Sequence, residues 1–137
     1  MLKEPGKPLT IMAFDYGLRR VGVAVGNSIS QAGQPIKTIA AANLDGLFQE
    51  IQTLLQEWQP DLLVVGRPVH PDGAVHEMTA KATRFGNQLN GRFGLPVGWV
   101  DERYTSSVLE SDPKMRDNLD AHSAVLILEQ YFAESQN

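Results

Sequence analysis

Residues 9–26 read LTIMAFDYGLRRVGVAVG, and this stretch decides the fold. Its first part, residues 9–15, is an apolar run of strand length that ends in an acid, Asp15. A tight turn with a glycine follows over residues 16–20, and residues 21–26 alternate β-branched with small side chains. Two such runs around a short turn predict a β-hairpin.

The chain after this hairpin predicts a third strand and then a change to helical spacing. Residues 35–39 are expected to form an edge strand, because a proline at its start removes one hydrogen-bond donor. Apolar residues spaced three and four apart over residues 44–58 predict an amphipathic helix, with Asn43 as its N-cap. Residues 62–65 are a continuous apolar run, typical of a strand buried on both faces. Residues 66–73, which read GRPVHPDG, are expected to be a loop.

The remaining pattern predicts a further strand between helices. A second amphipathic helix is expected over residues 78–93, and Gly94 closes it. A fifth strand covers residues 96–100, and a short helix is expected over residues 104–110. Residues 119–132 predict a C-terminal helix.

The resulting order is β-β-β-α-β-α-β-α, and it predicts an α/β fold of the RNase H-like type. Three strands in an antiparallel meander and two parallel strands form a mixed five-stranded sheet, and helices cover both of its faces. The chain has 137 residues, of which 42% are hydrophobic and 20% are charged. These values are typical of one globular domain, and we expect a single domain with flexible residues 1–8.

Composition also limits the chemistry that the chain can perform. Because there is no cysteine, any metal ion must bind to oxygen or imidazole ligands. The sequence has no signal-peptide pattern and no apolar run of the roughly 20 residues that span a bilayer, so we expect a cytoplasmic protein with no membrane partner. The net charge of −4 argues against tight non-specific coating of nucleic acid. It is compatible with a nuclease, because carboxylates that gather around metal ions lower the net charge.

Acidic residues at the ends of three elements are candidates for a metal site. Asp15 ends the first strand, Asp101 and Glu102 follow the fifth strand, and Asp120 lies at the start of the last helix. Sites in open α/β sheets form at the carboxyl ends of strands, so these carboxylates are expected to converge. Such a group can hold two Mg²⁺ or Mn²⁺ ions for attack on a phosphodiester. Side chains alternate along a strand, so only one of Asp101 and Glu102 faces the site, and the sequence leaves open which one.

Each of these acids also has a purely structural interpretation. Asp15 precedes a glycine turn and is a favoured residue there. Asp101 and Glu102 can form an exposed ion pair with Arg103, which contributes little to stability. Asp120 complements the helix dipole in the first turn of a helix. The metal site is favoured because all these positions are directed to one edge of the sheet.

Four motifs, in this order and spacing, resemble the YqgF family. It is also called RuvX and is described as proposed pre-16S rRNA nucleases and Holliday-junction resolvase-like proteins. The resemblance extends from about residue 9 to residue 132. The motifs are FDYGLRRVGVAVGNSIS at residues 14–30, GRPVHPDG at residues 66–73, VDERYTS at residues 100–106 and LDAHSAVLILEQYF at residues 119–132.

The resemblance implies roles for the four acids already named. Asp15, Asp101, Glu102 and Asp120 would be catalytic, and Asp15, Glu102 and Asp120 would bind the metal. Ser123 stands where RuvC resolvases have a second acid on the last helix. The segment before Asp120 is also shorter than in the family and lacks its glycine-rich, lysine-containing loop.

The resemblance implies a metal-dependent nuclease that hydrolyses phosphodiesters in the 5′-end maturation of pre-16S rRNA during ribosome biogenesis. Its partner would be structured RNA, and it would act as a monomer or weak homodimer with Mg²⁺ or Mn²⁺. Two alternatives stay open: a Holliday-junction resolvase that cuts DNA as a dimer, and a non-catalytic module that binds nucleic acid or the ribosome. Candidate contacts to phosphate are Arg19, Arg20, Arg67 and Arg103.

Overall fold

The computed structural model describes residues 8–69, 72, 77–103 and 116–135, with the side chains of Arg103 and residues 116–120 excepted. The expectations for flexible residues 1–8 and for a helix over residues 104–110 therefore fall almost entirely outside the described residues. No described helix is long and apolar enough to span a membrane.

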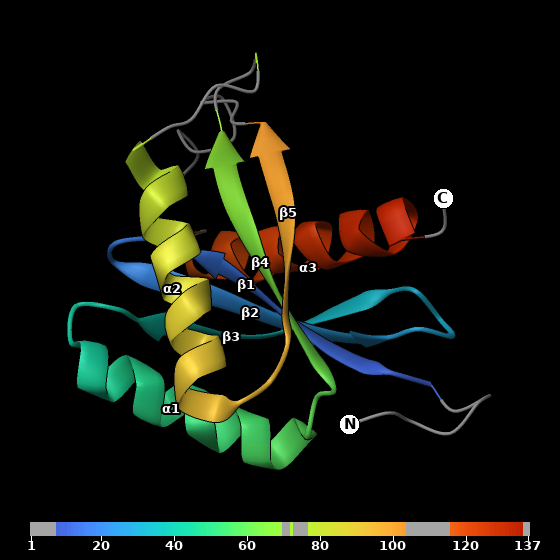
Figure 1. Ribbon diagram of the computed structural model, residues 1–137, viewed down its shortest axis with the longest axis horizontal. Coiled ribbons are helices and arrows are strands. Elements are labelled where there is room, and N and C mark those ends of the chain that lie inside the picture. Colours follow the sequence, from blue (N-terminus) through green and yellow to red (C-terminus); the bar gives the residue numbers. More distant parts are fainter. Residues whose placement is uncertain (1–7, 70–71, 73–76, 104–115, 136–137) are drawn as a thin grey trace.

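A five-stranded mixed sheet forms the centre of the molecule (Figure 1). The strand order is β3-β2-β1-β4-β5. The first three strands pair antiparallel, whereas β4 pairs parallel with both β1 and β5. This arrangement confirms the predicted mixed sheet and the predicted order of elements. The elements are β1 (Thr10–Tyr16), β2 (Arg20–Asn27), β3 (Gly33–Ala40), α1 (Leu44–Trp58), β4 (Leu62–Val69), α2 (Glu77–Phe93), β5 (Val97–Arg103) and α3 (Arg116–Ser135).

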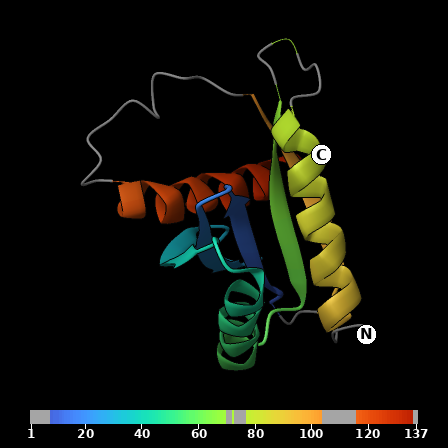
Figure 2. The same ribbon diagram turned by 90° about the vertical axis from the view of Figure 1, so that its left-hand side faces the viewer.

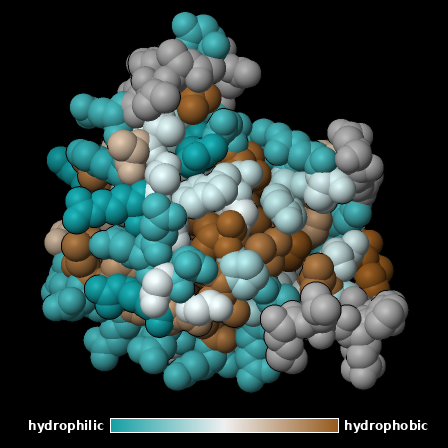
Figure 3. Space-filling model, viewed as in Figure 1, coloured by the Kyte–Doolittle hydropathy of each residue, from teal (hydrophilic) through white to brown (hydrophobic). Residues whose placement is uncertain are grey.

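Helices cover both faces of the sheet, as predicted. Helices α1 and α2 pack on one face and α3 crosses the other, which Figure 2 shows from the side. Alternating strand residues serve the two faces: Met12 and Phe14 pack with α1 and α2, whereas Ile11 and Ala13 pack with α3. The outer surfaces of α1 and α2 are mostly hydrophilic (Figure 3). Both helices are therefore amphipathic and bury only their apolar sides.

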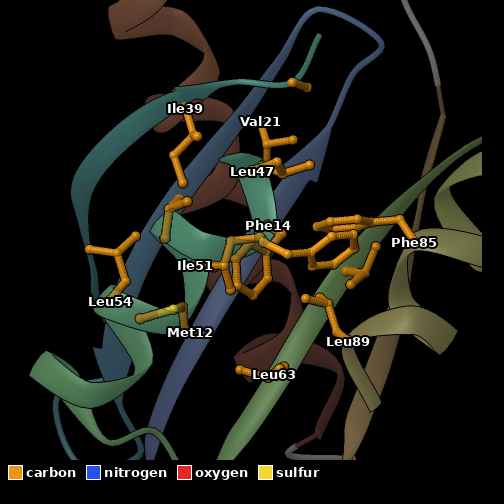
Figure 4. Packing of buried hydrophobic residues seen from close by; sticks show 14 of the residues in the cluster. Met12, Phe14, Val21, Ile39, Leu47, Ile51, Leu54, Leu63, Phe85 and Leu89 are labelled. Atoms are coloured by element: carbon orange, nitrogen blue, oxygen red, sulfur yellow. The ribbon is translucent and has the colours of Figure 1, made fainter. Parts of the chain in front are cut away.

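Phe85 of α2 belongs to the larger core and points toward Phe14 (Figure 4). Its ring contacts Phe14 of β1 edge to face and stacks on Tyr16 and Phe48, with centroid distances of 5.8, 4.6 and 6.0 Å. These contacts fix α2 and α1 against the sheet. They also fix the end of β1, where Asp15 lies between Phe14 and Tyr16.

Local signals set the helix ends. The Asn43 side chain accepts a hydrogen bond from the backbone N–H of Gly46 at 3.2 Å, which confirms the predicted N-cap. Gly94 has a φ of 69° and follows the last residue of α2, as predicted. The Thr79 hydroxyl donates to the carbonyl oxygen of Pro68 and ties the first turn of α2 to β4.

Three predicted boundaries were wrong. Strand β4 continues to Val69, where a loop was expected, because β5 pairs with it along Arg67, Pro68 and Val69. Proline is tolerated there because the pairing of β1 with β4 ends at Gly66. Strand β5 likewise continues beyond its predicted end at residue 100 and contains Asp101 and Glu102. Helix α3 begins at Arg116, so Asp120 is its fifth residue and does not open the helix.

Candidate functional site

Asp15 and Glu102 lie on the same face of the sheet, under helix α3. In β1, Ile11 and Ala13 face α3, and Asp15 follows in the same alternation. In β5, Val100 packs with α3, and Glu102 follows two residues later. We call Asp15 and Glu102 the acid pair. Glu102 therefore shares a face with Asp15, and Asp101 does not.

Gly66 of β4 separates the two strands that carry the acid pair. It pairs with Asp15 on one side and with Val100 on the other. A Cβ atom on Gly66 would lie 2.8 Å from Oε2 of Glu102 and would overlap the side chain of Ile127 in α3. The missing side chain therefore leaves the space that the Glu102 carboxyl group occupies. The sequence predicted a loop from Gly66 onward and gave no sign of this role, beyond the fact that a glycine beside a core strand signals a close approach.

The surroundings of the acid pair disfavour two negative charges. Burial, and next the negative charge of Asp15, raise the pKa of Glu102 from its ordinary value of 4.5 to about 8. Two carboxylates in a partly desolvated place need a shared proton or a cation to lower their repulsion. Near neutral pH a proton on Glu102 meets this need, and a bound cation could replace that proton.

Asp101 lies on the opposite face, where it forms an ion pair with Arg67. The Nε–H of Arg67 donates to Oδ1 of Asp101 at 2.9 Å, and the two residues are direct partners across β4 and β5. The side chain of Asp101 is 55% exposed. Sequence analysis named Arg103 as the partner in this ion pair, and the described partner of Asp101 is Arg67. The structure does not bring Asp101 to the acid pair.

The remaining candidates are Asp120 and three arginines, and for two of these four residues only the backbone is described. The backbone of Asp120 belongs to α3, but its side chain, like that of Arg103, lies outside the described part. Arg19 is exposed in the turn after β1, and its carbonyl oxygen accepts a hydrogen bond from the N–H of Ala41 at 2.8 Å. Arg20 is half-buried at the start of β2. Both arginines therefore lie close to Asp15 along the chain.

The acid pair fits a divalent cation by its donor chemistry. Mg²⁺ and Mn²⁺ prefer carboxylate oxygens, and the acid pair supplies two carboxyl groups on one face of the sheet. Within the described residues, no group of three or more histidines, aspartates and glutamates is close enough to hold a metal ion. A third protein ligand would have to come from a side chain outside that part, and Asp120 is the candidate that the sequence offers.

Comparison with known proteins gives consistent matches along nearly the whole chain. The family model described as RuvX, Holliday junction resolvase, matches residues 9–134. A protein of Polynucleobacter necessarius named "Putative pre-16S rRNA nuclease" is 76% identical over 127 residues, covering 93% of this chain and 86% of that protein. A protein of the same name from Burkholderia vietnamiensis is 51% identical over 133 residues, covering 91% of this chain and 89% of that protein.

Among solved structures, the chain is similar to T. thermophilus RuvC in complex with Holliday junction substrate. The TM-score is 0.58 at 11% sequence identity, and the match covers 94% of this chain and 96% of that chain. At so low an identity the likeness concerns the fold, which is RNase H-like, as predicted. The family model and the two relatives settle the relationship by sequence, and the chain belongs to the RuvX family.

Proposed function

We propose that this protein is a metal-dependent nuclease that hydrolyses phosphodiester bonds during 5′-end maturation of pre-16S rRNA. One observation carries the proposal: Asp15 and Glu102 lie on one face of the sheet on either side of Gly66, so that two carboxyl groups can serve as ligands of one cation site. Membership of the RuvX family supports the nuclease class. The names of the two relatives support pre-16S rRNA as the substrate.

In this proposal Asp15, Glu102 and Asp120 hold one or two Mg²⁺ or Mn²⁺ ions. Such ions supply activation of the attacking water and neutralisation of the charge on the leaving oxygen. Asp15 and Glu102 orient the ions from two different strands, and the contacts of Phe14 and Tyr16 with Phe85 keep Asp15 in place. Because Glu102 retains a proton at neutral pH without a cation, that proton must leave when a cation binds.

The proposed substrate is structured RNA, and its phosphates would contact arginines near the acid pair. Arg19 lies exposed in the β1–β2 connection four residues after Asp15, and Arg20 is the first residue of β2. Arg103 follows Glu102 in the sequence. A few arginines at the site suffice for a protein with a net charge of −4, because bound cations also attract the phosphate. The proposed role in ribosome biogenesis implies a protein that acts in the cytoplasm.

A second candidate is a Holliday-junction resolvase that acts on DNA. The description of the family and the fold shared with RuvC favour it. Paired cuts across a four-way junction require two active sites related by symmetry, so this activity predicts a dimer on the junction. The pre-rRNA nuclease requires one active site.

The test is cleavage of a labelled pre-16S rRNA 5′ fragment and of a DNA four-way junction, each with Mn²⁺ and with Mg²⁺. Wild type is compared with Asp15→Asn and with Glu57→Gln, which removes an exposed carboxylate at the far end of α1. We expect metal-dependent cleavage of the RNA by wild type and Glu57→Gln and at least a hundredfold slower cleavage by Asp15→Asn. Cleavage of the junction alone would favour the resolvase. If the wild-type protein is folded and binds RNA but cuts neither substrate, the result would favour the non-catalytic binding module.

A further inference from the structure

Arg67 lies on the face of the sheet opposite the acid pair, where two side chains contact its guanidinium group. Its Nε–H donates to Asp101 at 2.9 Å, and its guanidinium carbon lies 5.1 Å from the centroid of the Trp99 ring. Trp99 in turn packs on Gly86 of α2, where a Cβ atom would overlap the indole ring. The guanidinium group is therefore fixed both by an ion pair and by a flat aromatic surface.

This anchoring leaves part of the guanidinium group without a partner in the described part of the chain. Arginine has five N–H donors, and the bond to Asp101 uses the one on Nε. No described residue accepts a hydrogen bond from the two terminal nitrogens, and the side chain is 31% exposed. Two adjacent terminal nitrogens in a fixed plane match the geometry of two phosphate oxygens.

The position of Arg67 relates it to the acid pair. Arg67 pairs with Asp101, and the next pair along β4 and β5 is Pro68 with Glu102. Arg67 and Glu102 therefore lie at the same end of two neighbouring strands, whose ends Figure 1 shows together beside the start of α2. A nucleic-acid strand that crossed this end of the sheet to reach the acid pair would pass Arg67 on the opposite face.

We propose that Arg67 binds a phosphate that flanks the scissile bond, and that Asp101 and Trp99 are positioning residues for its guanidinium group. The proposal rests on the proposed function in that the ligand is the nuclease's polynucleotide. It gives Asp101 a role distinct from catalysis. The negative charge of Asp101 by itself repels a polyanion, so its presence beside a phosphate site is useful only if it orients Arg67.

The experiment measures equilibrium binding in EDTA, so that no cleavage is needed. Fluorescence anisotropy follows a labelled RNA stem-loop with single-stranded flanks, and separately a DNA four-way junction, at several salt concentrations. The variants are Arg67→Gln, Arg67→Lys and Asp101→Ala. The control is Lys37→Gln, which removes an exposed cation paired with Glu50 on β3 and α1.

Each variant has a distinct expected result. Arg67→Gln binds about tenfold more weakly, and the slope of log affinity against log salt falls by about 0.7 to 0.9, the change for one lost phosphate contact. Arg67→Lys keeps the slope but binds several-fold more weakly, because lysine lacks the planar fork. Asp101→Ala also weakens binding, although loss of a negative charge alone would strengthen it. Lys37→Gln keeps the affinity within about twofold of that of wild type, and it changes the salt slope by less than about 0.2.

An unchanged slope and affinity in Arg67→Gln would overturn the proposal, and so would stronger binding by Asp101→Ala. Failure of wild type to bind either probe at low salt would overturn it as well. The test is separate from that of the proposed function, because binding in EDTA is read without hydrolysis. Normal cleavage by wild type together with an unchanged salt slope in Arg67→Gln would reject the phosphate site alone.

Discussion

Glu102→Gln is expected to make the metal-free protein more stable at high pH. The pKa of Glu102 in the folded protein, about 8, lies above its ordinary value of 4.5. Between these values the unfolded chain has lost the proton that the folded protein keeps. The stability associated with this group is therefore fully present below pH 4.5, and it falls as pH rises through 8. Glutamine resembles the protonated form at every pH, so Glu102→Gln should not show this loss of stability with rising pH.

The size of the effect follows from the same pKa values. A difference of 3.5 pKa units, from 4.5 to about 8, corresponds to roughly 5 kcal/mol at about 1.36 kcal/mol per unit. This is an upper limit, because the side chain of Glu102 is not fully buried and solvent screens part of the interaction. We expect Glu102→Gln to exceed wild type by about 2–4 kcal/mol at pH 9 and by less than about 1 kcal/mol at pH 5.

The assay is urea unfolding in EDTA at pH 5, 7 and 9, followed by circular dichroism. Asp101→Asn is the matched control, since it changes the neighbouring carboxylate on the exposed opposite face. Its free energy of unfolding should differ from that of wild type by a similar amount at each pH, within about 1 kcal/mol. Parallel pH profiles for wild type and Glu102→Gln would refute the argument that burial and Asp15 hold the proton on Glu102.

Other predictions concern the same site and the core beneath it. Gly66→Ala should lower stability by about 1–3 kcal/mol and weaken Mn²⁺ binding, because its Cβ would displace Glu102 and Ile127. Gly91→Ala, in a helix position where a Cβ meets nothing within 4 Å, should instead stabilise by up to about 1 kcal/mol in the same unfolding assay. Phe85→Ala should cost about 3–5 kcal/mol in that assay, and a smaller loss would contradict its place in the core. Calorimetric Mn²⁺ titration should give affinity that rises toward pH 8 for wild type, whereas a pH-independent affinity would show that no proton leaves on binding.

The sheet and its helices could be predicted because their signals are local. The hairpin of β1 and β2 follows from two apolar runs around a short turn, and α1 follows from helical spacing after the Asn43 cap. The extensions of β4 and β5 could not be predicted. Glycine, proline and charged residues there suggest loops, and only the pairing of the two strands with each other keeps them extended.

The candidate site was predictable only as far as local signals reach. Alternation along β5 implied that Asp101 and Glu102 face opposite ways, but the choice depends on which face carries α3. The glycine at position 66 signals a close approach but does not say of what, and the Arg67–Asp101 pair has no local signal, because both depend on the register between β4 and β5. The sequence supplied the acids, and long-range packing sorted them by face.

The most direct test of the account compares two neighbouring substitutions, Glu102→Gln and Asp101→Asn. The measurement is the single-turnover rate of pre-16S rRNA cleavage in Mn²⁺ at saturating protein, with the wild type as reference. The account predicts that Glu102→Gln lowers the rate at least a hundredfold, whereas Asp101→Asn keeps it within about threefold of wild type. Equal losses in both variants, or a greater loss in Asp101→Asn, would contradict the assignment of the chemistry to the face that Glu102 shares with Asp15.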